Sequence, residues 1–389
     1  MRVYFSSRSD FGHGENAVSL AAAVRRAAGL PLLDLTRSNP GDPGLGLEPD
    51  VSALLALSLD VAARYIPTSF GLDSARSAVS DYYADHGVTV DPSCVVLSAS
   101  TSEAYGWLFT VLGGPGETVL VPSPSYPLFG TLAQLAGIVL RPYRSVADVE
   151  RGLAAGAVAV IVVHPNNPTG LLVAPHERRS LSGLCARHGA TLIADEVFLD
   201  YTGVAGTRQV LPTTFASEAD CLTVTLSGLS KVCGLPGLKA GWMVVSGPTL
   251  DRTALMGRLD HVADAYLSVG MPVQLALPGL LASRRTFQAR VKARLAVSWG
   301  LVSGVASVID GGWCAPVPVR ESAVEAPPGE ATAMALLAEG VLVHPGYLFG
   351  YDEPVVVLSL LTPVEVLSQA LPTIVRRARG AATPRPSEN

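Results

Sequence analysis

Residues 227–242 read Ser227-Gly-Leu-Ser-Lys231-Val-Cys-Gly-Leu-Pro-Gly-Leu-Lys239-Ala-Gly-Trp242. This stretch holds two of the three lysines in the chain, the third being Lys292. It follows an apolar run, Leu222–Leu226, which is typical of a buried strand. A lysine at the end of a buried strand loses its proton more easily than one in water and can form a Schiff base. A loop lysine whose charged head reaches solvent is the alternative.

On both sides of this stretch, short apolar segments alternate with helical segments over residues 50–280. Strands that alternate with helices form βαβ units, so the pattern predicts an α/β fold with a mostly parallel sheet flanked by helices. The predicted strands are Val95–Ser98, Thr118–Val121, Val158–Val163, Thr191–Ala194, Leu222–Leu226 and Trp242–Val245.

The two ends of the chain predict a smaller α+β domain. We expect the large domain to span residues 50–285 and the small domain to span residues 1–49 and 286–380. The tail, residues 381–389, is Pro-rich and polar and is expected to be disordered. The elements expected in the small domain are the helix Val18–Ala28, a long helix Arg284–Val305, a small sheet from Val341–Val343 and Val355–Leu361, and a helix near Val364–Arg379.

Composition excludes several classes of protein. Apolar residues make up 49% of the chain and charged residues 16%, which is typical of a folded protein rather than a disordered one. The net charge is -5 without a basic cluster, which argues against a nucleic-acid partner. The cysteines and histidines show no spacing typical of a disulfide framework or a metal site. The sequence shows no signal peptide and no membrane span, so we expect the cytoplasm as the compartment.

Polar residues cluster where the predicted strands end, which is the edge where open α/β sheets bind ligands. The first cluster, Ser98-Ala-Ser100-Thr101-Ser102-Glu103, opens a predicted helix, and a helix N-terminus rich in hydroxyls suits a phosphate. A plain N-cap would explain one of these hydroxyls. The second cluster, Pro122-Ser-Pro-Ser-Tyr126-Pro127, presents an aromatic ring on a rigid turn. That ring could stack on a ligand or belong to an ordinary packed turn.

Two further clusters follow the next strands. His164-Pro-Asn-Asn167-Pro168-Thr-Gly170 offers amide donors on a loop that prolines restrain. Asp195, in Ala194-Asp195-Glu196-Val197-Phe198, directly follows a buried strand. An acid in that position is costly without a partner, and a protonated heterocyclic nitrogen would be one. The alternative role of Asp195 is to cap the next helix.

Together these clusters resemble the class I/II aminotransferases, which are pyridoxal-phosphate (PLP) enzymes of fold type I. The resemblance extends from about Asp34 to Leu371 and rests on Asn-Asn-Pro-Thr-Gly, Asp-Glu-Val-Phe and Ser-Lys followed eight positions later by a basic residue. It implies that Lys231 is the Schiff-base lysine and proton shuttle, and that Asp195 pairs with the pyridinium nitrogen. It also implies a homodimer, because Tyr65 in Tyr65-Ile-Pro-Thr-Ser-Phe-Gly71 matches a residue that reaches the phosphate of the neighbouring subunit.

The remaining implied roles concern the cofactor. Asn167 would hydrogen-bond the phenolic oxygen of the cofactor ring, and Tyr126 would stack on the ring and contribute to catalysis. The residues implied to hold the phosphate are Ser100, Thr101, Ser102, Ser230, Lys239 and, from the partner, Tyr65.

The sequence departs from the family pattern at three positions. Phe198 replaces a usual tyrosine, a loss for which Tyr201 could compensate, and Lys239 stands where arginine is commoner. The segment Val355-Val-Val-Leu-Ser359 lacks the arginine with which many relatives bind the substrate carboxylate. We therefore expect the carboxylate to be bound by Arg37, beside Asn39, or by Arg320.

The sequence thus predicts a PLP enzyme that acts on an amino acid, most simply an aminotransferase with a 2-oxo acid acceptor. The altered carboxylate recognition leaves a second reaction class, elimination or replacement on an amino acid such as S-adenosylmethionine. The third reading is a non-enzymatic regulator with this fold. Such regulators usually carry a DNA-binding extension, and we expect none in this sequence.

Overall fold

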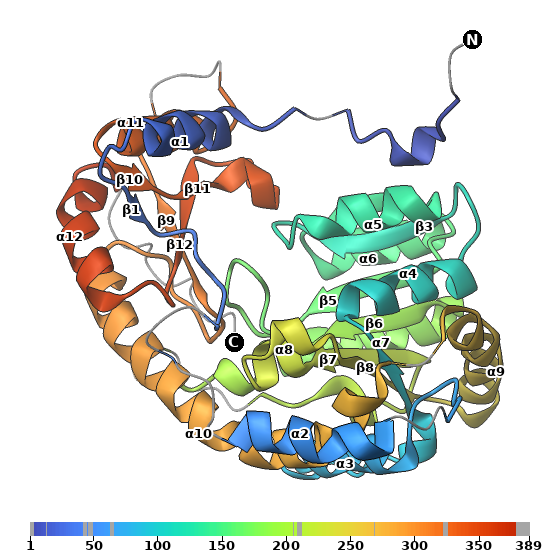
Figure 1. Ribbon diagram of the computed structural model, residues 1–389. Coiled ribbons are helices and arrows are strands. Elements are labelled where there is room, and N and C mark those ends of the chain that lie inside the picture. The colour runs from blue at the N-terminus through green and yellow to red at the C-terminus, as the bar shows by residue number, and fades with distance from the viewer. Residues whose placement is uncertain are drawn as a thin grey trace.

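The computed structural model describes residues 4–12, 14–41, 45, 50–62, 66–204, 206–207, 212–267, 269–321 and 326–378 (Figure 1). Tyr65 and the tail, residues 381–389, lie outside these ranges. Within them the chain forms a seven-stranded, a three-stranded and a two-stranded sheet.

The seven-stranded sheet has the order β2-β8-β7-β6-β5-β3-β4. Strand β8 is antiparallel to both of its neighbours, and the other pairs are parallel. This confirms the predicted α/β fold with a mostly parallel sheet. The strands are β2 (Val95–Ser98), β3 (Thr118–Pro122), β4 (Val139–Tyr143), β5 (Ala159–Val163), β6 (Thr191–Asp195), β7 (Thr223–Gly228) and β8 (Gly241–Ser246).

Helices cover both faces of this sheet because successive strand residues point to opposite faces. One face packs against α4 (Thr101–Leu112), α5 (Leu128–Ala136) and α9 (Thr249–Tyr266). The other face packs in part against α6 (Val146–Ala154) and α7 (Pro175–His188). The rest of it packs against α2 (Asp50–Ala62), α3 (Asp73–Ala84) and the first half of α10 (Met271–Val302).

The smaller domain has its own apolar core. Its sheets are β11-β12-β9, which is antiparallel, and the parallel pair β1-β10. In Figure 1, α10 (orange) runs from α2 and α3 to α12 and so joins the two parts. The elements are α1 (Ala17–Ala27), β1 (Leu33–Asp34), β9 (Cys314–Pro318), α11 (Glu330–Ala338), β10 (Val341–Leu342), β11 (His344–Pro345), β12 (Val355–Ser359) and α12 (Val364–Val375).

The long helix differs from its predicted bounds, Arg284–Val305. It begins at Met271 and ends at Val302. Pro278 lies inside it and masks the helical pattern, although Leu277, Leu280 and Leu281 are buried on either side of this proline. Burial against α2 and α3 therefore outweighs the local cost of the proline.

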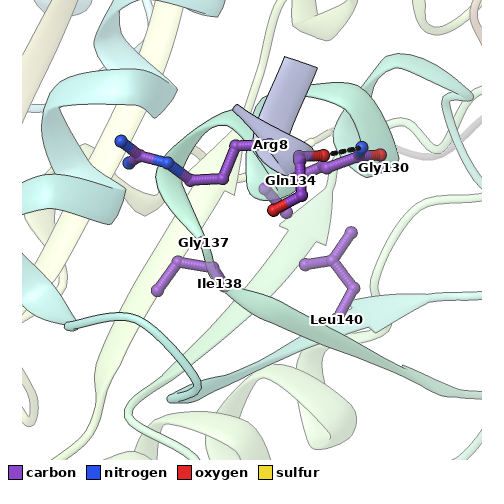
Figure 2. A pocket seen from close by; sticks show the side chains of 8 residues that line it. Arg8, Gly130, Gln134, Gly137, Ile138 and Leu140 are labelled. Atoms are coloured by element: carbon purple, nitrogen blue, oxygen red, sulfur yellow. Dashed lines mark hydrogen bonds between the residues drawn. The ribbon is translucent and has the colours of Figure 1, made fainter. Parts of the chain in front are cut away.

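The N-terminal segment contacts α5, which covers the large sheet, although the helix α1 that follows it packs into the core of the smaller domain. It includes a short 3-10 helix, η1 (Ser7–Ser9), and Figure 1 shows it running from α1 across to α5. Gln134 of α5 donates a hydrogen bond to the carbonyl of Asp10 (2.7 Å), and Arg8 donates one to the carbonyl of Leu135 (3.3 Å). A surface pocket of about 350 Å³ lies between this segment and α5 (Figure 2).

Across the described ranges, the helices lack the combination of length and apolar character that crossing a membrane requires. The same residues include no group of three or more His, Cys, Asp or Glu side chains that could hold a metal ion.

Candidate active site

Three predicted site residues lie at the ends of three neighbouring parallel strands. Asp195 is the last residue of β6, Asn167 follows β5, and Lys231 lies in α8 (Leu229–Val232), directly after β7. In the sheet register, Asp195 pairs with Val163 on one side and with Leu226 on the other. The structure therefore brings these residues to one edge of the sheet, as the sequence predicts.

Asp195 is buried, with an exposed fraction of 6%. Its Oδ2 accepts a hydrogen bond from the Tyr105 hydroxyl (3.1 Å), and its Oδ1 accepts one from the Val197 amide (3.2 Å). Burial raises the pKa of Asp195 to about 6, although these hydrogen bonds and Lys231 act in the opposite direction. Among the described residues, Asp195 forms no ion pair, so a cationic ligand would relieve its burial.

Lys231 is partly buried and lies against aromatic rings. Its Nζ is 4.7 Å from the ring centroid of Trp313 and 5.6 Å from that of Phe198. Burial lowers the pKa of Lys231, while the nearby acidic groups of Cys314 and Asp195 oppose that shift. The amine is thus easier to deprotonate than one in water, as a Schiff-base lysine requires.

Tyr201 does not compensate for Phe198. Its hydroxyl donates a hydrogen bond to the backbone carbonyl of Lys231 (2.5 Å). It therefore fixes the main chain of α8 and is not directed at a ligand.

The two neighbouring asparagines differ in what they contact. Asn166 is engaged within its own loop, since its Oδ1 accepts hydrogen bonds from Thr169 and its Nδ2 donates one to the carbonyl of Pro124. The Oδ1 of Asn167 accepts a hydrogen bond from the thiol of Cys314 (3.5 Å). Of the two amides, Asn167 is the one available to a ligand.

The predicted phosphate loop is the N-terminus of α4. Ser100 is the N-cap, and its hydroxyl accepts a hydrogen bond from the Glu103 amide (3.1 Å). A Cβ added at Gly241 would lie 3.1 Å from the backbone nitrogen of Thr101, a tight contact, so the glycine helps β8 pass close to this loop. Thr101 and Ser102 form the first turn, whose amides lack partners within the helix.

Ser230 and Lys239 reach the same end of the sheet because Gly228, at the end of β7, pairs with Gly241, at the start of β8. Ser230 lies in α8, and Lys239 precedes β8 with an exposed side chain and a φ of 53°. A left-handed backbone is uncommon for a residue with a side chain and is often found at functional sites.

Tyr126 has a half-exposed ring that lies edge-on to Phe129, with ring centroids 5.8 Å apart. Burial raises the pKa of its hydroxyl, and the nearby charge of Asp195 adds to the shift. A pocket of about 190 Å³ is bordered by Tyr126, Phe129, Leu348 and Phe349. Tyr126 therefore stands at the edge of a surface pocket with its ring partly open to solvent, where a ligand ring could stack.

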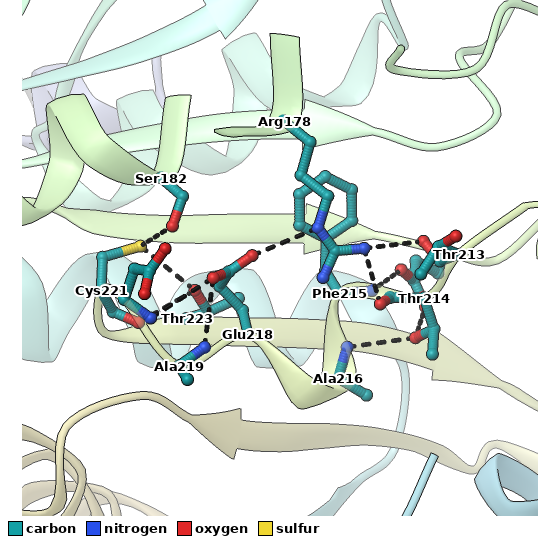
Figure 3. Close-up of polar contacts among 12 residues, drawn as sticks. Arg178, Ser182, Thr213, Thr214, Phe215, Ala216, Glu218, Ala219, Cys221 and Thr223 are labelled. Carbon is teal, nitrogen blue, oxygen red and sulfur yellow. Dashed lines mark hydrogen bonds and ion pairs between the residues drawn. The ribbon is translucent and has the colours of Figure 1, made fainter. Parts of the chain in front are cut away.

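A second layer of contacts fixes the turn that carries Asp195. Glu196 is buried and accepts hydrogen bonds from the Thr214 hydroxyl and the Phe215 amide, both at 2.6 Å. Arg178 of α7 holds that segment in turn, by an ion pair with Glu218 (3.2 Å) and a hydrogen bond to the carbonyl of Thr214 (2.8 Å; Figure 3). Burial raises the pKa of Glu196 to about 7.

His164 fixes the loop that carries Asn167. It is buried, and its Nδ1 accepts a hydrogen bond from the Val173 amide (3.0 Å). Burial lowers the pKa of His164 to about 3. A protonated Nδ1 could not accept this hydrogen bond, so the His164 imidazole stays neutral in the folded state.

We expect His164 to make folding stability depend on pH. The unfolded chain binds a proton below pH 6.5 that the folded chain refuses until about pH 3, so this contribution is full above pH 6.5 and is lost on acidification. Between pH 7 and pH 5 the loss should be about 2 kcal/mol. Urea denaturation of wild type and His164→Asn at both pH values isolates the effect, because asparagine keeps an acceptor and does not titrate. Equal pH dependence of the two proteins would contradict this role.

The structure separates the candidate carboxylate-binding residues. Ser359 of β12 pairs with Cys314, and its amide donates a hydrogen bond to the carbonyl of Leu35 (2.8 Å). The residues that come after Leu35 in the chain therefore lie near Cys314. Arg37 is exposed there and lies 3.8 Å from Asp34.

Asn39 is also exposed in this loop, and its Oδ1 accepts a hydrogen bond from the Gly41 amide (3.1 Å). Arg320 lies beyond the opposite end of β9, and its amide bonds to the carbonyl of Arg377. Arg320 is six positions beyond Cys314, which in extended chain is roughly 20 Å. The structure therefore does not bring Arg320 to the site.

Sequence reasoning missed Tyr105, Trp313 and Cys314 as contributors. Tyr105 lies one turn after Thr101 in α4, and this spacing could have predicted that it faces the sheet. Trp313 and Cys314 follow a Gly-Gly pair in a segment rich in proline, and nothing local predicts that it reaches Lys231.

These residues fit the cofactor that the resemblance implies. Asp195 is a buried acid in need of a cation, which a protonated pyridine nitrogen would provide. Lys231 offers an amine with a lowered pKa, and the N-terminus of α4 offers amides and hydroxyls to a phosphate.

Comparison with known proteins agrees with this geometry. The family described as "Aminotransferase class I and II" matches residues 48–356. The glutamate-pyruvate aminotransferase AlaA of Haemophilus influenzae is 28% identical over 263 residues, which are 64% of this chain and 63% of that protein. The 4-dedimethylamino-4-oxo-anhydrotetracycline transaminase OxyQ of Streptomyces rimosus is 33% identical over 265 residues, which are 66% of this chain and 69% of that protein.

Solved structures agree on the fold. The alanine aminotransferase of Pyrococcus furiosus superimposes with a TM-score of 0.85 at 20% identity, over 96% of this chain and 100% of that one. This chain matches less than two thirds of the length of the Haemophilus protein, whereas the family match covers most of this chain. The chain therefore belongs to the class I and II aminotransferase family.

Proposed function

We propose that this protein is a PLP-dependent aminotransferase that moves the amino group of an amino acid to a 2-oxo acid. One observation carries the proposal: an amine, a buried carboxylate and a carboxamide lie together at the carboxyl ends of three adjacent strands, in the order typical of the family. The names of the relatives, which include alanine and glutamate-pyruvate aminotransferases, support the choice of reaction.

Pyridoxal phosphate is the cofactor of this family, and when bound it draws electrons away from the α-carbon of the substrate. In the proposed mechanism, Lys231 would hold the cofactor through its Nζ and, as a free amine, would move the α-proton of the substrate. Asp195 would keep a proton on the ring nitrogen, and Tyr105 orients that carboxylate. Tyr126 would stack on the ring and so limit the access of water.

The other proposed contacts position the cofactor. Asn167 would donate to the phenolic oxygen, and Ser100, Thr101, Ser102, Ser230 and Lys239 would bind the phosphate. Phe198 contributes an apolar wall beside Lys231 rather than a hydrogen bond.

A second reaction, elimination or replacement, has one observation in its favour. β12 reads Val-Val-Val-Leu-Ser and is buried along its length, so it offers no cation to a carboxylate. To test the proposed function, purified protein loaded with PLP would be given a panel of amino acids, with absorbance and 2-oxo acid consumption followed. Transamination requires both an amino-acid-dependent spectral change and turnover of a 2-oxo acid. Product formation without 2-oxo acid consumption would establish the second reaction instead.

We expect Arg37→Ala to weaken binding of the best amino acid by roughly 1.5–3 kcal/mol, because a charge-assisted hydrogen bond is lost. The PLP content should not change. Arg320→Ala is the matched control, since Arg320 lies far from Cys314, and its substrate affinity should equal that of wild type. If Arg37→Ala also binds like wild type, neutral donors hold the carboxylate.

We further propose a homodimer with shared sites, located in the cytoplasm. What supports the dimer is the match of Tyr65 to a residue that reaches the partner's phosphate in relatives. Mixing Tyr65→Phe subunits with Lys231→Ala subunits should produce hybrids with one intact site and one doubly altered site. Such hybrids should recover about half of the wild-type activity per dimer, provided that each parent is impaired. A fully active monomer in sedimentation would contradict shared sites.

A further inference from the structure

Cys314 joins the two parts of the molecule at the site. It is the first residue of β9 in the three-stranded sheet, whereas Asn167 belongs to the loop after β5 of the seven-stranded sheet. Ala315 and Val317 of β9 are buried in the smaller core. Since side chains alternate along a strand, Cys314 points away from that core, toward Asn167.

The direction of the Cys314–Asn167 hydrogen bond determines how the carboxamide is oriented. The thiol donates and Oδ1 accepts, at 3.5 Å. A carboxamide carries its donors on Nδ2 and its acceptor on Oδ1, so fixing Oδ1 toward Cys314 turns Nδ2 to the opposite side. The thiol remains a donor at neutral pH, because burial raises the pKa of Cys314 to about 12.

We infer that Cys314 is a positioning residue that holds Asn167 with its NH₂ group toward the phenolic oxygen of the cofactor. The inference rests on the proposed function and adds a determinant of the cofactor's acidity. A donor on the phenolic oxygen makes that oxygen a weaker acceptor for the proton of the lysine-bound cofactor, which lowers the pKa of that proton. Because Cys314 belongs to the smaller domain, a movement of that domain that alters the Cys314–Asn167 contact would also change the pKa of the cofactor proton.

The test is a pH titration of the cofactor absorption band in purified, PLP-loaded protein. Cys314→Ala frees the Asn167 carboxamide, and the titration midpoint should rise by about 0.5–1 pH unit, the equivalent of one ordinary hydrogen bond. Cys314→Val more than fills the lost volume, since two methyl groups replace the thiol, without a donor, and should give the same shift. Cys94→Ala, which removes a buried cysteine of the large domain, should leave the midpoint unchanged.

A double-mutant cycle separates this role from a direct one. In an Asn167→Ala background, Cys314→Ala should cause no further shift, because the residue through which it acts is gone. The same shift in both backgrounds would overturn the inference and indicate a direct effect on Lys231. A shift in Cys314→Ala that Cys314→Val reverses would also overturn it, since volume would then be the cause. If wild-type protein binds no PLP, the proposed function fails instead.

Discussion

Lys231→Ala is expected to lower kcat by roughly 10⁴, because one side chain both binds the cofactor and transfers the proton. The variant should still fold, since it truncates a partly buried side chain and leaves the neighbouring rings of Trp313 and Phe198 in place. It should also retain PLP without a covalent bond.

Borohydride reduction and peptide mapping of wild type check the assignment directly, because reduction makes the lysine–cofactor bond permanent. The label should appear on the peptide that contains Lys231. Lys292→Ala, which alters a lysine of α10, is the control and should keep both the label and the activity. A label on Lys239 or Lys292 would sink the assignment.

Asp195→Asn is expected to bind PLP and lower kcat by roughly 10²–10³. Asparagine keeps the shape of the side chain and loses the charge that holds a proton on the ring nitrogen. The control is Asp200→Asn, because Asp200 is similarly buried but contacts Tyr82 (3.1 Å) and His86 (3.3 Å) instead. Near-normal turnover of Asp195→Asn would show that the charge has no catalytic role.

In the protein without PLP, Asp195→Asn should increase folding stability at high pH, although it lowers kcat in the loaded enzyme. Burial raises the pKa of Asp195 to about 6 from 3.8, so the folded state favours the protonated acid. This contribution is complete below about pH 3.8 and is lost as the pH rises through 6. At pH 8, cofactor-free Asp195→Asn should therefore be more stable than wild type by about 2–3 kcal/mol, and at pH 4 about equal to it. Denaturant unfolding at both pH values measures the difference.

The central sheet could be predicted from the sequence because its strands are buried on both faces and read as apolar runs. Val95–Ser98 coincides with β2, and the other five predicted strands differ from the structure by at most two residues at either end. Strand β4 was missed since it lies at the sheet edge, where Arg141 and Pro142 are exposed. A proline is tolerated there because the outer side of an edge strand has no partner.

The candidate site could be predicted where a motif sits next to a strand, as with Asp195 and Lys231. Cys314, which reaches the site from the smaller domain, could not be predicted, because its place depends on how two sheets pack against each other. Arg37 and Arg320 were both named from the sequence, but the sequence could not show that β9 places Arg320 at the far end. Local sequence carries no information on that packing. The assigned roles stay predictions until the variants above are measured.

The pairing of β1 with β10 has a consequence for synthesis on the ribosome. Leu33 pairs with Val341, so about 300 residues must be translated before β1 meets its partner strand. At roughly 5–20 residues per second this takes about 15–60 s. Val18 and Ala22 of α1 are buried in the finished core of the smaller domain, which contains residues from α11 and α12 as well. During translation their apolar face has no native cover, so nascent chains that stall before residue 341 should be bound by chaperones.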